Sequence, residues 1–466
     1  MIFCSFEYLI FFVVILFLMV VVRNNQAKKY ILLAGSCYFY ACWDYRFLLL
    51  LVTLSTANYY AGLKIASTQA LVGKKRWLTA SIVFDLMILG FFKYFNFFVA
   101  SLNSLMLSSE IRLPLMNIIL PVGISFMTFE VISYTIDIYR GKNKPAASLL
   151  DLSLLVTFFP HLVSGPILKP GHFLPQLDRE IIVRWKNIEN GTQIFLVGMV
   201  KKVLVADRLA FFVDPVFEAP QDYSSGTVWL AVIAYAIQIY CDFSGYTDMA
   251  IGSAKCLGFE FPPNFNMPYI SKSISEFWRR WHISLSTWLR DYLYIPLGGN
   301  RKGRLRQYVN LMVVMLLGGL WHGANWNFVI WGGLHGLGLT IHKLYSDILR
   351  PKAVGSRLHA CMSWLLTTVF VCVAWVFFRS TDFSVSFIII KKMFLIGDSE
   401  GIAWYATSLF VIIPVLIVSH YLGLKLGEPP YVRYESTWGC FVLFFVLMGL
   451  FYLAPLNSSP FIYFQF

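Results

Sequence analysis

Between Tyr308 and His322 the chain reads YVNLMVVMLLGGLWH, a run without an acidic or basic side chain before its last residue. His322 stands 14 residues beyond Tyr308. A continuous helix would therefore carry it about 21 Å along the axis, deep into a hydrocarbon layer of ~30 Å. A polar side chain at that depth is expensive and usually faces a bundle interior or a cavity. The run predicts a membrane helix that ends in a buried histidine.

The whole chain shares this apolar character. Of its 466 residues, 58% are hydrophobic, 17% are aromatic and 14% are charged, and the mean hydropathy is +0.65. An average soluble domain carries roughly a quarter charged residues. The composition excludes a disordered chain, a coiled coil and a secreted disulfide scaffold. It predicts an all-α polytopic membrane protein whose residues 1–466 form a single integral-membrane domain.

Apolar runs recur along the chain and predict about 11–12 transmembrane helices. They lie at 8–22, 30–43, 47–63, 78–92, 113–139, 192–213, 227–251, 308–322, 326–342, 359–378, 404–426 and 438–454. Some are shorter than the ~20 residues that a perpendicular span requires, so either the boundaries of these runs are inaccurate or the helices are tilted, broken or re-entrant. A re-entrant or broken element is predicted at Leu149–Leu168, where Pro160, His161, Gly165 and Pro166 interrupt an apolar frame. The first run lacks a basic segment before it and a cleavage site after it, which favours a retained helix.

The basic residues predict which side of the membrane the loops face. Lys and Arg number 38 against 25 Asp and Glu, a net charge of +13. The excess falls in short loops at 23–29, 64–76, 140–144 and 301–306, which is typical of cytoplasmic loops and does not point to nucleic acid. Both termini are then predicted outside. The eight cysteines include no CxxC pair and are expected to be buried core residues.

The longest polar interval, Gly252–Gln307, contains the first candidate site. Ser273 and Glu276 fit a capping box at the start of a helix, and Pro296 would end it. Aromatic and apolar side chains then recur at steps of three and four, with the arginines Arg279 and Arg280 largely on the other face. That apolar face comprises Trp278, Trp281, His282, Leu285, Trp288, Leu289 and Tyr292. Periodicity favours an interfacial helix anchored by tryptophans, and His282 keeps a substrate site open as the alternative.

Two further constellations surround intramembrane polar residues. The stretch Gly318–Trp326 places His322 between Trp321 and Asn325, and Gly319 and Gly323 would let another backbone approach closely. His322 is either a structural histidine or a functional one. Asp242 and Asp248 lie near the end of another run, where they could hold a partner helix or orient a histidine, and structural pairing is the expected role. Lys201 and Lys202 are expected to reach a polar cavity or the interface. No HExxH-type spacing occurs, so no metal site is predicted.

Several motifs in order resemble the membrane-bound O-acyltransferase (MBOAT) family, in its bacterial branch of alginate O-acetyltransferases, peptidoglycan O-acetyltransferases and teichoic-acid D-alanyl transfer proteins. The motifs are 126–140 (FMTFEVISYTIDIYR), 158–166 (FFPHLVSGP), 238–248 (QIYCDFSGYTD), 264–269 (NFNMPY), 277–286 (FWRRWHISLS), 320–326 (LWHGANW) and the ending 460–466 (PFIYFQF). The likeness spans nearly the whole chain, with the motif-bearing core at about 113–345.

The resemblance implies a fold, a site and a reaction. The fold would be a ring of tilted helices around a central funnel, with re-entrant and interfacial helices. His322 would be the catalytic residue and His282 the second active-site position. An acetyl group, with acetyl-CoA as the implied donor and no bound cofactor, would cross the bacterial inner membrane to a hydroxyl outside.

A hydroxyl needs a base whose pKa lies near neutrality, which a histidine supplies. We therefore expect His322 to be the general base and His282 to orient or polarise the thioester, although the roles could be exchanged. The tryptophans Trp278, Trp281 and Trp288 would line the donor entry, and Arg279 and Arg280 would meet the coenzyme phosphates. Trp321 and Asn325 are expected beside the substrate.

The acceptor is expected to be an envelope polysaccharide such as alginate or peptidoglycan. The predicted outward loops, Asp214–Gly226 and Arg379–Ala403, are too short to form a polysaccharide-binding domain. Short loops of this kind indicate that a partner is needed. The resemblance implies that this partner is either an SGNH-type acetyltransferase outside the membrane or a small relay protein. A transporter or flippase for an envelope precursor explains the helices equally well but not the motifs. A purely structural scaffold leaves His322 without a purpose.

Overall fold

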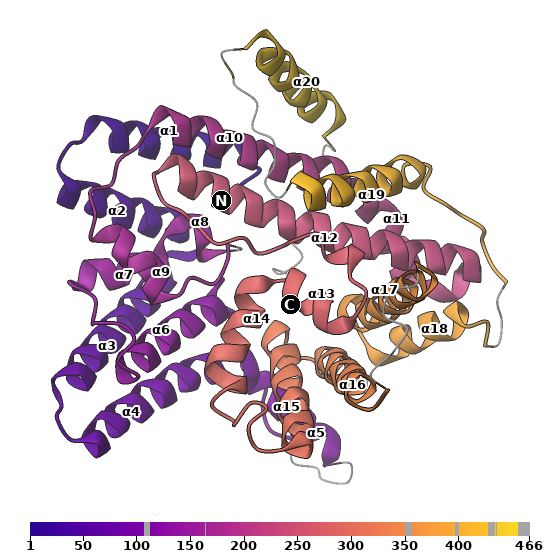
Figure 1. The fold of residues 1–466 in the computed structure, drawn as a ribbon, viewed down its shortest axis with the longest axis horizontal. Helices are drawn as coiled ribbons and strands as arrows, with labels where there is room; N and C mark the ends of the chain where they lie inside the picture. The colour runs from indigo at the N-terminus through magenta and orange to yellow at the C-terminus, as the bar shows by residue number, and fades with distance from the viewer. Residues whose placement is uncertain are drawn as a thin grey trace. The chain divides into compact units, whose positions relative to one another are not determined.

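The computed structural model of the chain describes residues 1–106, 112–163, 165–349, 357–396, 400–426, 434 and 436–454. The motif expected at 460–466 and Ser164 of the expected broken element lie outside these ranges. In the described ranges the structure is helical, and the one strand-like feature is an isolated bridge between Tyr223 and Ile402 (Figure 1). The all-α prediction is confirmed.

The chain divides into two compact units. The first comprises residues 1–195 and 247–262, and the second comprises residues 196–246 and 263–466, so the division passes through helices α10 and α12. The prediction of a single domain over residues 1–466 stays a prediction.

The helices of the first unit, in chain order, are α1 (Phe6–Val21), α2 (Asn25–Asp44), η1 (Tyr45–Phe47), α3 (Leu48–Ser67), α4 (Leu71–Leu89), η2 (Gly90–Tyr94), α5 (Phe95–Leu105), α6 (Ile124–Tyr139), α7 (Leu149–Thr157), α8 (Phe159–Leu162) and α9 (Pro170–Leu177). The helices that continue from one unit into the other are α10 (Trp185–Met199) and α12 (Ser225–Cys256). The second unit adds η3 (Val200–Ala206), α11 (Asp207–Glu218), η4 (Pro220–Asp222), η5 (Pro268–Ile270), α13 (Ile274–Arg280), α14 (Ile283–Leu289), η6 (Arg290–Tyr294), α15 (Arg304–His322), α16 (Trp326–Leu349), α17 (Arg357–Arg379), α18 (Phe383–Met393), α19 (Leu409–Leu426) and α20 (Thr437–Leu453).

Every predicted apolar run overlaps a helix, but the run at 113–139 is only helical from Ile124 onward. Residues 112–120 form no helix, and Gly123 has a left-handed backbone (φ 75°) just before α6. Pro114 and Pro121 lie in this stretch, and proline lacks the N–H that an interior helical position donates. The prediction of a helix over 113–123 is therefore wrong. The broken element at 149–168 is confirmed as two helices, α7 and α8, separated at Phe158.

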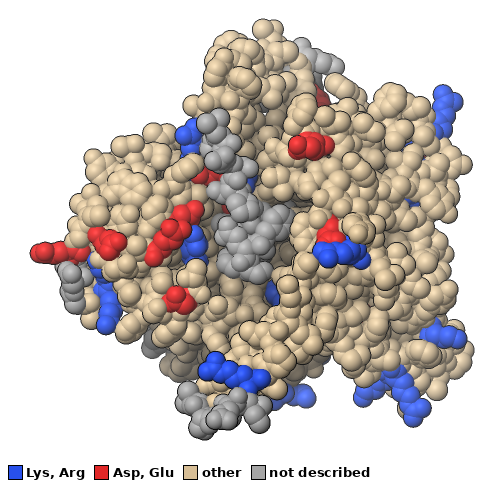
Figure 2. All heavy atoms as spheres, turned by 180° about the vertical axis from the view of Figure 1, so that it is seen from behind, with Lys and Arg blue, Asp and Glu red and all other residues tan. Residues whose placement is uncertain are grey.

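Five helical stretches in the described ranges are long and apolar enough to cross a membrane: 25–67, 71–105, 225–256, 357–379 and 409–426. Large apolar side chains stand exposed on the outer helices, as Phe410 on α19 and Phe451 on α20 illustrate with exposures of 72% and 79%. Charged residues are few and scattered on the face shown in Figure 2. Contiguous exposed apolar surface is unfavourable in water, so these features favour a lipid environment.

Short polar caps separate the apolar helices. Ser5 accepts a hydrogen bond from the backbone N–H of Tyr8, and Asn24 accepts one from that of Ala27. Such caps satisfy N–H groups that have no partner within the first helical turn. They explain why the apolar N-terminal sequence forms separate helices, α1 and α2, and not one long rod.

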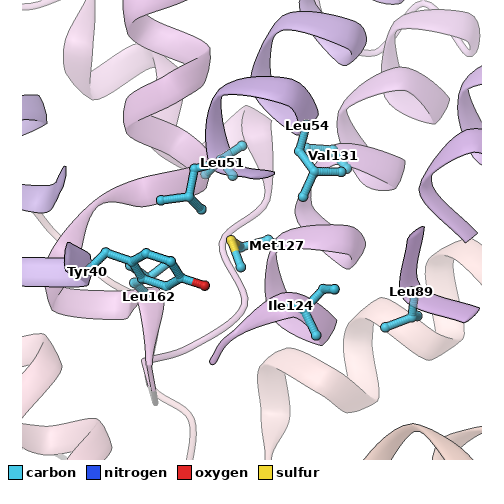
Figure 3. Packing of buried hydrophobic residues seen from close by; sticks show 9 residues of the cluster. Tyr40, Leu51, Leu54, Leu89, Ile124, Met127, Val131 and Leu162 are labelled. Carbon is cyan, nitrogen blue, oxygen red and sulfur yellow. The ribbon is translucent and has the colours of Figure 1, made fainter. Parts of the chain in front are cut away.

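The first unit is built on a core shared by α2, α3, α4, α6, α7 and α8. Its buried members are Tyr40, Leu51, Leu54, Leu89, Ile124, Met127, Val131, Val156 and Leu162 (Figure 3). The Tyr40 hydroxyl donates to the carbonyl of Val122, which ties the segment before α6 to α2. The same unit buries an ion pair between Lys29 and Asp151 at 2.6 Å.

In the second unit, α15 and α16 form a tight helical hairpin that carries His322. A Cβ atom added at Gly332 would lie 2.3 Å from the carbonyl oxygen of Met315, and one at Gly319 would lie 2.2 Å from that of Phe328. The expected close backbone approach at Gly319 is therefore confirmed. A Cβ atom at Gly323 would meet the ring of Phe328, which is a side-chain contact and not a backbone one.

The hairpin yields a stability prediction with a built-in control. Gly332→Ala should lower stability by about 1–3 kcal/mol, because the new methyl group must push apart two backbones. Gly333→Ala should be neutral or slightly stabilising, because its Cβ meets only the Leu316 side chain at 3.5 Å and alanine favours helix. Thermal unfolding of both detergent-purified variants measures the difference. Equal melting temperatures would show that the α15–α16 contact is looser than the structure has it.

Candidate active site

The chain around His282 is not the continuous helix that its aromatic periodicity predicts. α13 ends at Arg280, Trp281 is extended, and His282 adopts a left-handed backbone (φ 44°, ψ 55°) before α14 begins at Ile283. The predicted N-cap is confirmed, since Ser273 Oγ accepts from the Glu276 N–H at 3.2 Å. The prediction of one amphipathic helix through Tyr292 is wrong. A left-handed backbone is uncommon outside glycine, and such strain clusters at functional sites.

The segment Asn264–Asn266 holds this break open. The Asn264 carbonyl accepts from the Ile283 N–H at 2.9 Å, and the Asn266 N–H donates to the Arg280 carbonyl at 2.9 Å. The Asn264 side-chain oxygen accepts from both the N–H and the hydroxyl of Ser284, at 3.1 and 2.9 Å. Backbone groups that lost their helical partners are thus satisfied by a segment some 18 residues earlier in the chain.

Asn264 also sets the tautomer of His282. Nδ1 of His282 lies 3.2 Å from the Asn264 side-chain oxygen, which can only accept. Nδ1 therefore carries the proton, and the lone pair of the neutral ring is on Nε2. The side chain is fully buried, and burial lowers the pKa of His282 to about 3. His282 is neutral at physiological pH, and its imidazolium would be a strong acid.

His322 lies at the last residue of α15, buried at 4% exposure in an aromatic cage. Its ring centroid lies 5.0 Å from Trp321, 5.0 Å from Trp331 and 5.3 Å from Phe378, each with edge-to-face geometry. The hairpin and α17 therefore fix this ring on several sides.

The second unit brings the two predicted histidines together. The ring centroids of His282 and His322 are 6.3 Å apart, and Trp321 contacts both rings, 6.0 Å from His282. Two imidazoles at this separation can both reach one small acyl group. The 39 intervening residues form α14, η6, the turns at 295–303 and most of α15, so the fold and not the local sequence creates the pair.

The other predicted site residues divide into those near the histidines and those used elsewhere. Trp321 is part of the pair's surroundings, and Trp278 reaches the same aromatic cluster through Trp331 at 5.7 Å. Trp281 is buried against Phe277 and Trp375, while Trp288 packs on Tyr292.

The polar residues that were predicted to bind substrate differ in the contacts they make. Asn325 caps α16, since its side-chain oxygen accepts from the Asn327 N–H at 2.8 Å. Arg280 pairs with Glu276 at 2.9 Å and also donates to the Asn266 carbonyl, whereas Arg279 is exposed. The substrate-binding roles of these residues stay predictions, and the geometry supports Arg279 better than Arg280 or Asn325.

Asp242 belongs to a buried ion cluster, as its structural interpretation predicts. The ammonium of Lys202 lies 2.6 Å from Asp242 and 2.8 Å from Asp207, and all three side chains are at most 2% exposed. The expectation that Lys202 reaches a cavity or the interface is wrong, because these two carboxylates hold it inside. Asp248 lies half-buried on the part of α12 that belongs to the first unit.

A family model described as membrane-bound O-acyltransferase matches residues 142–382, just over half of the chain, and both histidines fall within the match. The chain belongs to the membrane-bound O-acyltransferase family. It is therefore an acyltransferase and a multi-pass membrane protein, and the suspected resemblance is confirmed.

Individual relatives narrow the branch of this O-acyltransferase family. The chain is 44% identical to a probable alginate O-acetylase of Azotobacter vinelandii over 85% of its own length and 79% of the relative's. It is 39% identical to a probable alginate O-acetylase of Pseudomonas putida with both chains fully covered. A peptidoglycan O-acetyltransferase of Helicobacter pylori is 39% identical over 78% of this chain and 73% of the relative. These relatives support membrane O-acetyltransferase activity.

Sequence reasoning missed three residues that the structure places in polar roles. Asn264 holds His282, and its signal was a polar residue inside an otherwise aromatic and apolar motif. His335 accepts a hydrogen bond from the indole N–H of Trp278 at 3.2 Å. In the first unit, buried Glu130 accepts from the Leu168 N–H at 3.1 Å and pairs with His161, which braces the broken element from α6.

Proposed function

We propose that this protein moves an acetyl group from cytoplasmic acetyl-CoA to the outer side of a bacterial inner membrane for O-acetylation of an envelope polysaccharide. The observation that carries the proposal is the buried pair His282–His322 in a chain of the acyltransferase family. The names of the relatives point to alginate or peptidoglycan as the final acceptor. A thioester is already activated, so two imidazoles suffice for the transfer.

The path of the proton that is transferred in the reaction gives the two histidines different roles. The acceptor hydroxyl attacks the acetyl carbon, the carbon–sulfur bond breaks, and the hydroxyl proton must reach the departing sulfur. We assign the first removal of that proton to His322. We assign delivery of that proton to the departing sulfur to His282, whose neutral ring carries its lone pair at Nε2.

The tautomer of His282 argues against one expected role. A neutral ring with its proton on Nδ1 offers a lone pair at Nε2, so it cannot donate a hydrogen bond to the thioester carbonyl. We therefore replace polarisation of the thioester by proton transfer in the proposal. Exposed Arg279 remains the candidate for contacts with the coenzyme phosphates.

The proposed topology places both termini outside, and a contact within the second unit supports one part of it. The ammonium of Lys392 donates to the carbonyls of Gln221, Tyr223 and Glu400 at 2.8, 2.5 and 3.0 Å. These hydrogen bonds join segments of the two loops predicted to face outward, around 214–226 and 379–403, which agrees with both loops lying on the same side of the membrane.

A partner completes the proposed reaction. Both outward loops are short, and a large polymer cannot enter a bundle in which His322 is 4% exposed. We propose that an SGNH-type acetyltransferase outside the membrane, or a small relay protein, takes the acetyl group to the glycan.

Purified protein in lipid nanodiscs tests this function directly. With acetyl-CoA it should release free CoA slowly without any ion gradient, and added glycan should remain unacetylated until the partner is supplied. The His322→Ala variant provides the background rate. Gradient-dependent movement of an envelope precursor without CoA release would favour the flippase instead. Robust glycan acetylation by the chain alone would refute the relay.

A further inference from the structure

Two buried N–H groups in the aromatic cluster around His322 have no acceptor among the described residues. They are Nε1 of Trp331 and Nε2 of His335, on side chains that are both 0% exposed. Buried N–H groups nearly always find partners, and leaving one unpaired costs about 1–3 kcal/mol. Two such groups on neighbouring rings therefore call for an explanation beyond packing.

The hydrogen bond from Trp278 shows that His335 is a donor at Nε2. An indole N–H can only donate, so Nδ1 of His335, which receives it at 3.2 Å, must carry the lone pair. The neutral ring then has its proton on Nε2. His335 is thus locked in the tautomer opposite to that of His282, one offering a donor and the other an acceptor.

The Trp331 ring adjoins the predicted base, and the His335 ring adjoins Trp331. The ring centroid of Trp331 lies 4.6 Å from His335 and 5.0 Å from His322, so Trp331 stands between the two histidines. Its position is fixed by α16, whose backbone packs closely against α15 at Gly332. Two N–H donors thus lie in the aromatic cluster that surrounds His322.

We propose that Trp331 Nε1 and His335 Nε2 bind the carbonyl oxygen of the transferred acyl group and stabilise the negative charge that develops on it. This inference rests on the proposed function. When the acceptor oxygen attacks the acyl carbon, the carbonyl π electrons move onto the carbonyl oxygen. Two preorganised donors in a buried site lower the energy of the resulting oxyanion. Both protons stay on their nitrogens, and the carbonyl re-forms as the thiolate departs.

Isosteric variants separate this role from simple packing. Asparagine at position 335 places its amide near Nδ1, so His335→Asn can still accept from Trp278 but loses the donor at Nε2. Glutamine extends to the Nε2 position, so His335→Gln keeps a donor there. Trp331→Phe removes one N–H and keeps a ring. Trp229→Phe is the matched control, because the Trp229 N–H is already bonded to the Met393 carbonyl at 2.7 Å.

The measurement is kcat and KM for acetyl-CoA-dependent CoA release in nanodiscs, normalised to folded protein. His335→Asn and Trp331→Phe should each lose about 10²–10³-fold in kcat with a much smaller rise in KM, because oxyanion donors act mainly in the transition state. His335→Gln should lose about tenfold or less, and Trp229→Phe should match the wild type. Wild-type kcat in both donor-lacking variants, or an active Asn variant beside an inactive Gln variant, would overturn the proposal.

A binding measurement distinguishes failure of this inference from failure of the proposed function. Wild-type protein should bind acetyl-CoA more tightly than CoA, which lacks the carbonyl, and the two donor-lacking variants should lose that preference. If the wild type transfers acetyl groups but the variants keep the preference, the donor site is wrong and the function stands. If the wild type neither binds nor consumes acetyl-CoA, the proposed function is wrong, and the proposed donor site is wrong with it.

Discussion

The His322→Ala variant is expected to lose about 10²–10⁴-fold in acetyl-transfer rate while it remains folded and in the membrane, because a positioned general base contributes that much. Truncation also leaves a hole beside Trp321, Trp331 and Phe378. His322→Gln removes this ambiguity, since glutamine fills similar space and an amide cannot take a proton. Both variants should be equally inactive in assays of CoA release and acetyl transfer.

A matched histidine elsewhere in the second unit serves as the control. His359 lies near the start of α17, away from the cluster around His322, and His359→Ala should transfer acetyl groups at the wild-type rate. Elution volumes should agree for all variants, and the melting temperatures of His322→Gln and His359→Ala should match that of the wild type. Near-normal transfer by well-folded His322→Gln protein would remove His322 from the mechanism and leave it a structural histidine.

The helices could largely be predicted from the sequence because apolar content is a local property. Each predicted run overlaps a helix, and the exceptions have local causes that apolar content alone ignores. Residues 113–123 are as apolar as their neighbours, yet two prolines and a left-handed glycine keep them out of α6. The short helices α13 and α14 were predicted as one continuous helix, because the tertiary contacts that separate them are not visible in the local sequence.

The break at His282 could not be predicted from periodicity, because its cause lies elsewhere in the chain. Spacing at three and four residues correctly grouped Trp278 and Trp281 as buried, and both are at most 8% exposed. The backbone N–H groups of Ile283 and Ser284 donate to Asn264 and not to carbonyls one helical turn earlier, so the helix is interrupted at His282. These tertiary hydrogen bonds break the expected interfacial helix and position the buried imidazole of His282 in a defined tautomer.

Lys202 illustrates the same limit for charged residues. Asp242 could be recognised as structural because an intramembrane carboxylate needs a partner, but the sequence did not identify Lys202, 40 residues earlier, as that partner. The π-helical turn η3 places Lys202 between Asp242 on α12 and Asp207 at the start of α11. Three elements of the second unit thus meet at one buried ammonium.

Lys202→Met should therefore destabilise the protein by about 3–5 kcal/mol, because it leaves Asp207 and Asp242 buried without their cation. The expected result is a sharp loss of folded protein in the membrane and a lower melting temperature in what remains. Lys201→Met, one residue away and only partly buried, should have a far smaller effect. Expression level and thermal unfolding of the two variants provide the comparison.

The combined variant Lys202→Met, Asp207→Asn, Asp242→Asn identifies charge as the cause. This variant replaces all three charged side chains, so it leaves no uncompensated buried charge. Replacing a whole buried ion cluster by uncharged groups often changes the stability of a protein little. We expect it to recover much of the stability that Lys202→Met loses. If the triple variant is less stable than the single one, the cluster acts through its hydrogen-bond geometry, and the electrostatic explanation is wrong.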